Sequence, residues 1–239
     1  MGVVITGSCN HEALAHTFDI DVTGDDQPIS TAISLSDLSI VVPFRQSLDR
    51  PDALWRLFLL TGYLARTCPD AEIIVSDQSA PIPVARLATL PKRVRHVWNP
   101  ENIYSPASCK NEGARAAARR FLLFLDVDVV PTTALYSAIM RLMATPQFRM
   151  LWFPVHFLKK DAIDFPTLIR SCEINGTFRI NHFDQVGFTT GIQFFSNPFF
   201  WSLGGYDESF RGYGCEDIEM LHRCNLALNW LQRNEIDND

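Results

Sequence analysis

One stretch of the chain decides the fold: Phe121-Leu122-Leu123-Phe124-Leu125-Asp126-Val127-Asp128. Five consecutive apolar residues are typical of a strand that is buried on both faces of a parallel sheet. The two carboxylates that follow would be costly to desolvate unless a cation compensated them. Their oxygen atoms suit Mg²⁺ or Mn²⁺, which also bind phosphate oxygens. The alternative is that Asp126 and Asp128 only cap the next turn, so this motif alone does not decide the function.

Upstream of this stretch, three shorter runs have the character of strands. They are Ser39–Pro43, Glu72–Ser76 and Val94–Trp98, and the first two are rich in β-branched residues. A helical pattern lies between the first and second of these runs, and another lies between the third run and Phe121–Leu125. Strands that alternate with helices predict an α/β domain with a mostly parallel sheet flanked by helices.

Two helices are expected in this first half. One follows the first strand, with Asp49 as its cap and an inward face that includes Leu54, Leu57 and Phe58. The other is alanine-rich and covers 108–119. In the second half, the pattern predicts a helix over 134–143, a strand over 150–154, an apolar strand over 187–196 and a helix from Glu216. The polar region 159–185 suits a mobile or inserted segment.

Polar residues follow the predicted strands. Arg45 follows the first strand, Asp77 follows the second, and Asp126 and Asp128 follow the fourth. Ligands gather at the carboxyl ends of the strands in open α/β sheets. We therefore expect these clusters to meet at one edge of the sheet.

Composition narrows the class of protein. The chain has 239 residues, of which 47% are hydrophobic and 20% charged, as in a soluble globular domain. A formal net charge of -6 offers no basic field for nucleic acid. The six cysteines form no C-x-x-C pair, and no apolar run approaches the roughly 20 residues of a membrane span. We expect a cytoplasmic protein, or one that lies peripherally at the inner membrane face, with reduced thiols and no transmembrane segment.

A second constellation runs from Gly204 to Asp217. Glycines flank Tyr206 and Tyr213, and the adjacent acids Glu216 and Asp217 open the last predicted helix. Acids in a first helical turn often serve only to complement the helix dipole. The density of glycines and aromatic residues nevertheless favours a sugar site, where carboxylates accept hydroxyl protons.

Three stretches of the chain resemble, in the same order, the motif series of the beta-1,4-galactosyltransferase group: Ile40–Arg45, Phe124–Pro131 and Gly205–Asp217. Bacterial chondroitin-polymerase-like and capsule glycosyltransferases share much of this series, and the resemblance extends from about Leu38 to Arg223. It implies a GT-A fold, which is the Rossmann-like fold of nucleotide-diphospho-sugar transferases. It also implies a UDP-sugar donor, a glycan or glycoconjugate acceptor, Mn²⁺ or Mg²⁺, and inversion at the anomeric carbon.

The resemblance also implies roles at the donor end. Pro43, Phe44 and Arg45 match the segment that contacts the uridine and the diphosphate. Asp77 matches the acid that recognises the uracil. Gly191 falls in the strand that lines the donor sugar.

At the metal and acceptor ends, four of the five matched residues are acidic. Asp128 corresponds to the direct metal ligand, and Asp126 to an acid that faces the ribose or a metal-bound water. Tyr213 stands where the galactosyltransferases have a Trp that touches both sugars and phosphate. Glu216 matches the acceptor-binding acid, and Asp217 matches the catalytic base of a single displacement.

Two departures from the family pattern bear on the metal and the uracil. The family takes a further metal ligand, a His, from a segment beyond the acid pair, and the chain ends at Asp239 before such a residue. Either the chain is truncated or the metal site is incomplete, although His222 could substitute. The second departure is Ser76-Asp77-Gln78-Ser79, where many relatives have an acid before the aspartate and a glycine after it.

Several alternatives remain open at the level of sequence. Lys110 either lies near the diphosphate or belongs to a solvated helix face. A sugar-nucleotide pyrophosphorylase would need a glycine-rich loop after the first strand, and this chain has none there. A catalytically inactive sugar-nucleotide-binding module is the stronger rival. We expect a catalytic domain over 37–239, preceded by a loosely structured extension over 1–36.

Overall fold

The computed structural model describes most of the catalytic domain that the sequence predicts. The described residues are 3–4, 35–46, 52–86, 89–153, 155–158, 164–175, 183–187, 191–212 and 214–236. Most of the predicted N-terminal extension lies outside this set. Asp49 and Tyr213 lie outside it too. The polar region 159–185 is described in part, over 164–175 and 183–185.

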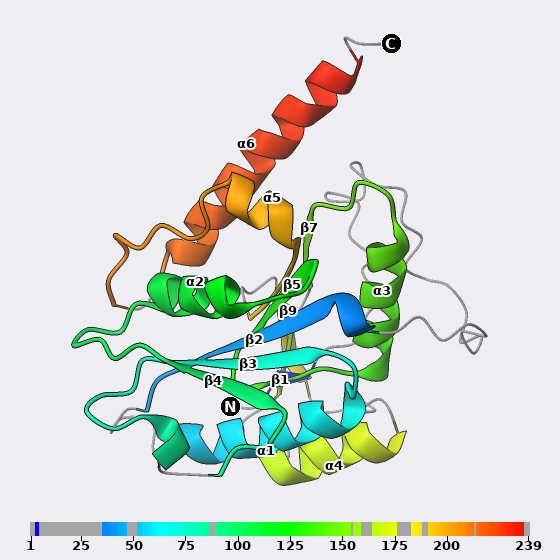
Figure 1. The fold of residues 1–239 in the computed structure, drawn as a ribbon. Coiled ribbons are helices and arrows are strands. Elements are labelled where there is room, and N and C mark those ends of the chain that lie inside the picture. Colours follow the sequence, from blue (N-terminus) through cyan, green and yellow to red (C-terminus); the bar gives the residue numbers. More distant parts are fainter. Residues whose placement is uncertain are drawn as a thin grey trace.

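A six-stranded sheet forms the centre of the molecule, in the order β4-β3-β2-β5-β10-β7 (Figure 1). Its strands are β2 (Leu38–Phe44), β3 (Glu72–Asp77), β4 (Val94–Trp98), β5 (Phe121–Leu125), β7 (Met150–Trp152) and β10 (Ile192–Ser196). Strands β4, β3, β2 and β5 are parallel, whereas β10 runs antiparallel to both β5 and β7. The predicted α/β class with a mostly parallel sheet is confirmed.

Helices cover both faces of this sheet. They are α1 (Ala53–Thr67), α2 (Pro106–Ala116), α3 (Thr133–Ala144), α4 (Phe165–Asn175), α5 (Asn197–Ser202) and α6 (Glu216–Ile236). Figure 1 shows α1 and α4 below the sheet and α2 above it, and α6 leads away from the body toward the C-terminus. No helix among the described residues is both long and apolar enough to cross a bilayer.

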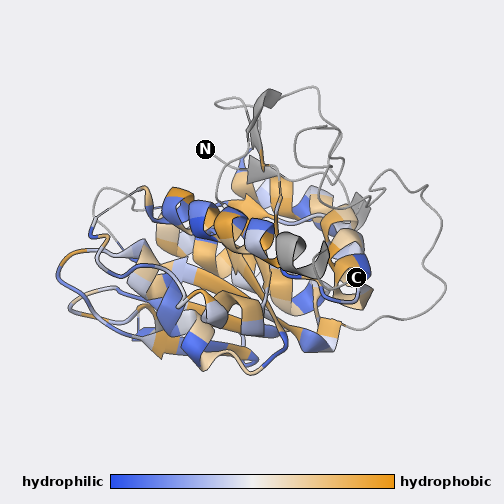
Figure 2. Cartoon of the chain, turned by 90° about the horizontal axis from the view of Figure 1, so that it is seen from above, coloured by the Kyte–Doolittle hydropathy of each residue, from blue (hydrophilic) through white to orange (hydrophobic). Residues whose placement is uncertain are grey.

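Alternation along the strands divides the core into two layers. Ile40 and Val42 point to the face covered by α1, α3 and α4, and Val41 between them points to the face covered by α2, α5 and α6. Hydrophobic residues prevail along the central strands, and hydrophilic ones gather on the elements that cover them (Figure 2). On the second face, Gly113 of α2 lies so close to β2 that an added Cβ would come within 2.3 Å of a Val41 methyl group. The helix that carries Lys110 is therefore held directly against the sheet.

A smaller four-stranded sheet lies beside the first, in the order β6-β1-β8-β9. It contains β1 (Val3–Val4), β6 (Val129–Val130), β8 (Val155–Leu158) and β9 (Phe183–Gly187). Strand β1 pairs parallel to β6 and antiparallel to β8. The residues that follow Asp128 thus enter this second sheet at once, and the turn 126–128 joins the two sheets.

Several details of the predicted elements are wrong. The helix predicted over 108–119 is Pro106–Ala116, and the strand predicted over 187–196 is Ile192–Ser196. Helix α1 begins at Ala53 after Asp52, not after a cap at Asp49. Phe58 is 46% exposed, because the inward face of α1 is formed by Leu57, Leu60 and Leu64 at helical spacing. By contrast, β4 and β5 have the predicted bounds, and α6 begins at Glu216 as expected.

Candidate active site

The carboxyl ends of the parallel strands bring the predicted polar residues to one edge of the sheet. Phe44 at the end of β2 pairs with Asp77 at the end of β3, and the amide of Gln78 donates to the Phe44 carbonyl at 2.9 Å. Strand β5 runs parallel to β2 on its other side and ends directly before Asp126. The expectation that these clusters share an edge is confirmed.

Asp77 is fully buried and organises the loop that follows β3. One of its carboxylate oxygens accepts from the amide of Ser79 at 2.8 Å, and the other accepts from the amide of Val84 at 2.7 Å and lies 2.9 Å from His96 Nε2. Burial by itself would raise the pKa of this carboxyl, but the hydrogen bonds hold it below its ordinary value. That Asp77 contacts the uracil stays a prediction. Its role in the structure is to hold the loop that follows β3 through the amides of Ser79 and Val84.

Two buried donors lie beside Asp77 without an acceptor among the described residues: Arg45 Nη1 and Gln78 Nε2. The other guanidinium nitrogen of Arg45 donates to the Asn102 carbonyl at 3.1 Å. The side-chain oxygen of Gln78 accepts from the amide of Ser105 at 3.0 Å, at the start of α2. Buried donors normally have partners, so these two atoms are exceptions among the described residues.

The acid pair at the start of α6 surrounds a buried ammonium group. Lys110 Nζ of α2 lies 2.5 Å from Asp217 Oδ1 and 3.3 Å from Glu216 Oε1. Because Lys110 is only 3% exposed, the hypothesis of a solvated helix face is wrong for this residue. Burial by itself would lower its pKa, but the carboxylates of Asp217, Asp126 and Glu216 together hold it above its ordinary value. Lys110 therefore carries a charge.

Asp126 belongs to the same electrostatic cluster. Its amide donates to the Gly191 carbonyl at 3.1 Å, and a Cβ at Gly191 would come within 3.4 Å of its Oδ2. Burial is the largest cause that raises the pKa of Asp126 to about 7; Lys110 opposes this, whereas the charges of Asp128, Asp217 and Glu216 add to it. The cluster thus has more carboxylates than ammonium groups, which favours a bound cation.

A divalent cation fits Asp126 and Asp128 only as a partly protein-bound ion. Among the described residues, no group of three or more His, Cys, Asp or Glu side chains could hold a metal. His222 is exposed on α6, and Asp128 Oδ2 lies 4.0 Å from Arg56. Mg²⁺ is commonly held by one or two carboxylates together with substrate phosphates and water. The pair therefore fits an ion shared with a diphosphate.

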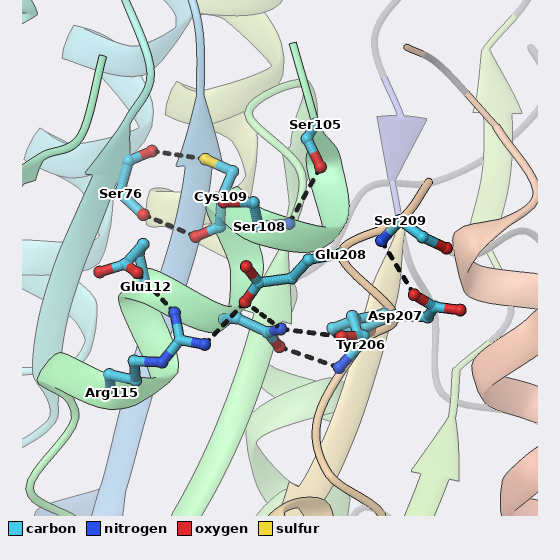
Figure 3. Close-up of polar contacts among 11 residues, drawn as sticks. Ser76, Ser105, Ser108, Cys109, Glu112, Arg115, Tyr206, Asp207, Glu208 and Ser209 are labelled. Carbon is cyan, nitrogen blue, oxygen red and sulfur yellow. Dashed lines mark hydrogen bonds and ion pairs between the residues drawn. The ribbon is translucent and has the colours of Figure 1, made fainter. Parts of the chain in front are cut away.

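Asn111, one residue after Lys110, ties the glycine-rich loop to α2. Its side chain donates to the Tyr206 carbonyl at 2.9 Å and accepts from the Tyr206 amide at 2.9 Å. Arg115 and Asn111 both donate to Glu208, and Figure 3 shows this contact between Arg115 and Glu208. Gly205 has a φ of +73°, and an added Cβ there would come within 2.7 Å of Asn111 Oδ1. The loop before Glu216 is thus fixed by the same helix that carries Lys110.

Sequence reasoning missed Asn111 and Gln193. Gln193 is fully buried on β10 and donates to Asp217 Oδ1 at 2.7 Å. A glutamine within the apolar run Ile192–Phe195 was a signal that could have found it, since a buried amide needs partners. The aromatic residues that surround this part of the chain, Phe194, Phe195, Phe199 and Phe200, are buried in the core.

A cavity of about 600 Å³ lies at the opposite edge of the sheet. Its lining includes Phe121 at the start of β5, Ser196 at the end of β10, and Trp230 and Leu231 of α6. None of the predicted site residues lines it. The five described cysteines are free, and Cys215 is the exposed one among them.

Two family models match the chain. The model described as "Glycosyl transferase family 2" matches residues 39–201, and the one described as "N-terminal domain of galactosyltransferase" matches residues 177–235. Among curated proteins, a validoxylamine A glucosyltransferase of Streptomyces hygroscopicus subsp. limoneus is 27% identical, over 78% of this chain and 47% of that protein. Its counterpart from S. hygroscopicus subsp. jinggangensis is 26% identical, over 78% and 50%. The chain spans about half the length of these relatives.

Solved structures that match the chain include the following three. A mutant Drosophila beta-1,4-galactosyltransferase 7 in complex with manganese, UDP-Gal and xylobiose is 18% identical, covering 78% of this chain and 59% of that chain, with a TM-score of 0.43. TarS 1-349 of S. aureus is 14% identical, covering 76% and 52%, with a TM-score of 0.48. The mannosyltransferase PcManGT of Pyrobaculum calidifontis, with GDP-Man and Mn²⁺, is 18% identical, covering 77% and 52%, with a TM-score of 0.46.

Asn111→Ala should loosen the loop before the acid pair. Both backbone groups of Tyr206 lose their partner, and a buried polar group left without one costs about 1–3 kcal/mol. We expect faster hydrogen exchange at the Tyr206 amide and a lower free energy of unfolding in urea. The exposed Asn225→Ala on α6 serves as the control and should change neither quantity. Unchanged exchange at Tyr206 would show that Asn111 does not hold the loop.

Proposed function

The chain belongs to glycosyl transferase family 2, and from this premise we propose that it is a metal-dependent inverting glycosyltransferase. It moves a hexose or N-acetylhexosamine from a UDP-sugar to a hydroxyl group of a glycan or glycoconjugate acceptor. The relatives' names, a glucosyltransferase and a galactosyltransferase among them, are in keeping with this class of donor.

The observation that supports this proposal most is the common electrostatic cluster of the donor-end and acceptor-end acids. Lys110 contacts Glu216 and Asp217 directly, and the charges of both acids contribute to the raised pKa of Asp126. A transferase needs its base close to the phosphate-bearing end of the donor, because both act on the same anomeric carbon. The acids at the start of α6, whose charges act on Asp126 at the end of β5, meet this requirement.

The donor would lie along the edge formed by β3, β2 and β5. Pro43, Phe44 and Arg45 would contact the uridine and the diphosphate, with Arg45 Nη1 as a donor that has no acceptor among the described residues. Asp77 would border the uracil, and Gly191 would line the donor sugar beside Asp126, whose Oδ2 would lie 3.4 Å from a Cβ at Gly191. Asp126 and Asp128 would hold Mn²⁺ or Mg²⁺, which when bound supplies a positive charge that stabilises the leaving diphosphate.

Asp217 is the proposed general base. It takes the proton of the acceptor hydroxyl while that oxygen forms a bond to the anomeric carbon and the bond from that carbon to the UDP oxygen breaks. Attack from the face opposite UDP inverts the configuration. Glu216 holds acceptor hydroxyl groups by accepting their protons in hydrogen bonds. Tyr213, outside the described residues, is proposed to contact both sugars and phosphate.

A sugar-nucleotide-binding module without activity is the second candidate. It is favoured by the observation that only Asp126 and Asp128 are offered to the metal by the described residues, without a third protein ligand. Such a module would bind UDP but would not turn over a UDP-sugar. The two candidates therefore differ in a measurable way.

Asp128→Asn should abolish metal-dependent UDP binding, because it removes the charge of the proposed direct ligand while keeping the shape of the side chain. Calorimetric titration of UDP with Mn²⁺, and again with a chelator, measures this. Asp37→Asn, at an exposed aspartate, is the matched control and should bind like the wild type. UDP affinity that is the same in Asp128→Asn and insensitive to chelator would remove the metal assignment.

Asp217→Asn should keep donor binding and lose transfer, since a carboxamide cannot accept the proton. General-base assistance contributes about 10² to 10⁴ in rate, so we expect a loss of that size in kcat with little change in donor KM. Glu216→Gln should instead raise the acceptor KM. Glu219→Gln, whose carboxylate pairs with Arg223 on the same helix, is the control. Full activity of Asp217→Asn would contradict the base assignment.

A further inference from the structure

Behind the proposed base lie two buried polar side chains, and we propose that Lys110 and Gln193 position it. They hold Oδ1 of Asp217, so that Oδ2 alone is left to take the proton of the acceptor hydroxyl. This inference rests on the proposed function, because it assigns to both residues a role in the same transfer step.

Both side chains reach the same oxygen atom from different parts of the fold. Lys110 Nζ on α2 lies 2.5 Å from Asp217 Oδ1, and Gln193 Nε2 on β10 lies 2.7 Å from it. No described residue forms a hydrogen bond with Oδ2, and the Asp217 side chain is 12% exposed. The two oxygens of this carboxylate are therefore not equivalent: one is bound inside the protein and the other is left for a ligand.

Stability alone does not account for this arrangement. Burying an ammonium group costs several kcal/mol even when it is paired, and an apolar side chain of similar volume often serves the fold as well or better. Lys110 is 3% exposed, and its ammonium group lies 4.9 Å from the centre of the Tyr206 ring and against the carboxylates of Glu216 and Asp217. Gln193 likewise interrupts an apolar strand. Lys110 and Gln193 are both costly to bury, and both donate to Asp217 Oδ1. Their shared contact therefore points to a role of this carboxylate that needs both donors.

The requirement is orientation. A carboxylate on a side chain with free rotation presents its oxygens in many directions, whereas proton transfer needs the acceptor oxygen within about 2.6–3.2 Å of the hydroxyl. Two donors on Oδ1, from α2 and β10, fix both the position and the plane of the group. Lys110 also lies 3.3 Å from Glu216, so one positive charge compensates both neighbouring acids.

The proton balance of the step is simple. The acceptor hydroxyl loses its proton to Asp217 Oδ2 as the new glycosidic bond forms, and Asp217 becomes a neutral acid. The bond from the anomeric carbon to the UDP oxygen breaks in the same step, and UDP leaves with its electron pair. Lys110 and Gln193 keep their own protons and their hydrogen bonds to Oδ1. Release of the Oδ2 proton to water after product departure returns the carboxylate.

Lys110→Met and Gln193→Met test the proposal, because each keeps the volume and removes the donor. A misplacement of about 1 Å at a reacting group can cost about 10²-fold, so we expect kcat to fall by about 10- to 100-fold in either variant. Gln193→Met leaves the charge of Lys110 in place, so both KM values and the affinity for UDP with Mn²⁺ should change little in that variant. Lys92→Met, at an exposed lysine, is the control and should keep wild-type kcat. Thermal unfolding monitored by circular dichroism identifies any variant that does not fold. If one of the two Met variants does not fold, the kcat of the other Met variant tests the proposal.

The decisive readout is a double-mutant cycle with Asp217→Asn. If Lys110 and Gln193 act through the base, adding either Met substitution to Asp217→Asn should lower kcat no further. Losses that multiply in the double variants, or a single Met variant with unchanged kcat, would overturn the positioning role. Full activity of Asp217→Asn by itself would instead overturn the proposed base, so the two failures can be told apart.

Discussion

The ion pair between Lys110 and the acids of α6 is the interaction on which the site depends. It joins three parts of the fold, since α2 supplies the ammonium group, α6 supplies both acids and β10 adds Gln193. Helix α2 can take this part because Gly113 lets it lie against β2. Without the charge of Lys110, Glu216 and Asp217 would repel each other and Asp126 within a partly buried cluster. The pair therefore explains how so many carboxylates share one edge of the sheet.

The division of labour at this edge follows from the topology. Parallel strands β3, β2 and β5 end side by side, and their loops supply Asp77, Arg45 and Asp126 from one direction. The acid pair comes from the far end of the chain, and Asn111 fixes the loop that leads to it. The ends of the strands thus carry the residues proposed to bind the UDP-sugar. The loop that Asn111 holds leads to the residues proposed to bind the acceptor.

Much of this could be predicted from the sequence, for physical reasons. Continuous apolar runs and helical periodicity are local signals, so β4, β5 and the start of α6 were correct to the residue. The direction of a side chain is decided by packing, so Phe58 was placed inward although it is exposed. The partners of Lys110, Asn111 and Gln193 lie about 24 to 107 positions away in the sequence. Local patterns do not show which such distant residues meet in the fold.

The cluster of Lys110, Asp126 and the α6 acids is proposed to catalyse sugar transfer from a UDP-sugar with the help of a divalent metal. The most direct test of this proposal is the release of UDP from UDP-galactose, UDP-glucose, UDP-GalNAc, UDP-GlcNAc and UDP-glucuronate, measured for the purified protein with Mn²⁺ and again with a chelator. We expect at least one donor to release UDP with Mn²⁺ and the chelator to stop the release. UDP binding without release from any of these donors would contradict the proposal and favour the inactive module.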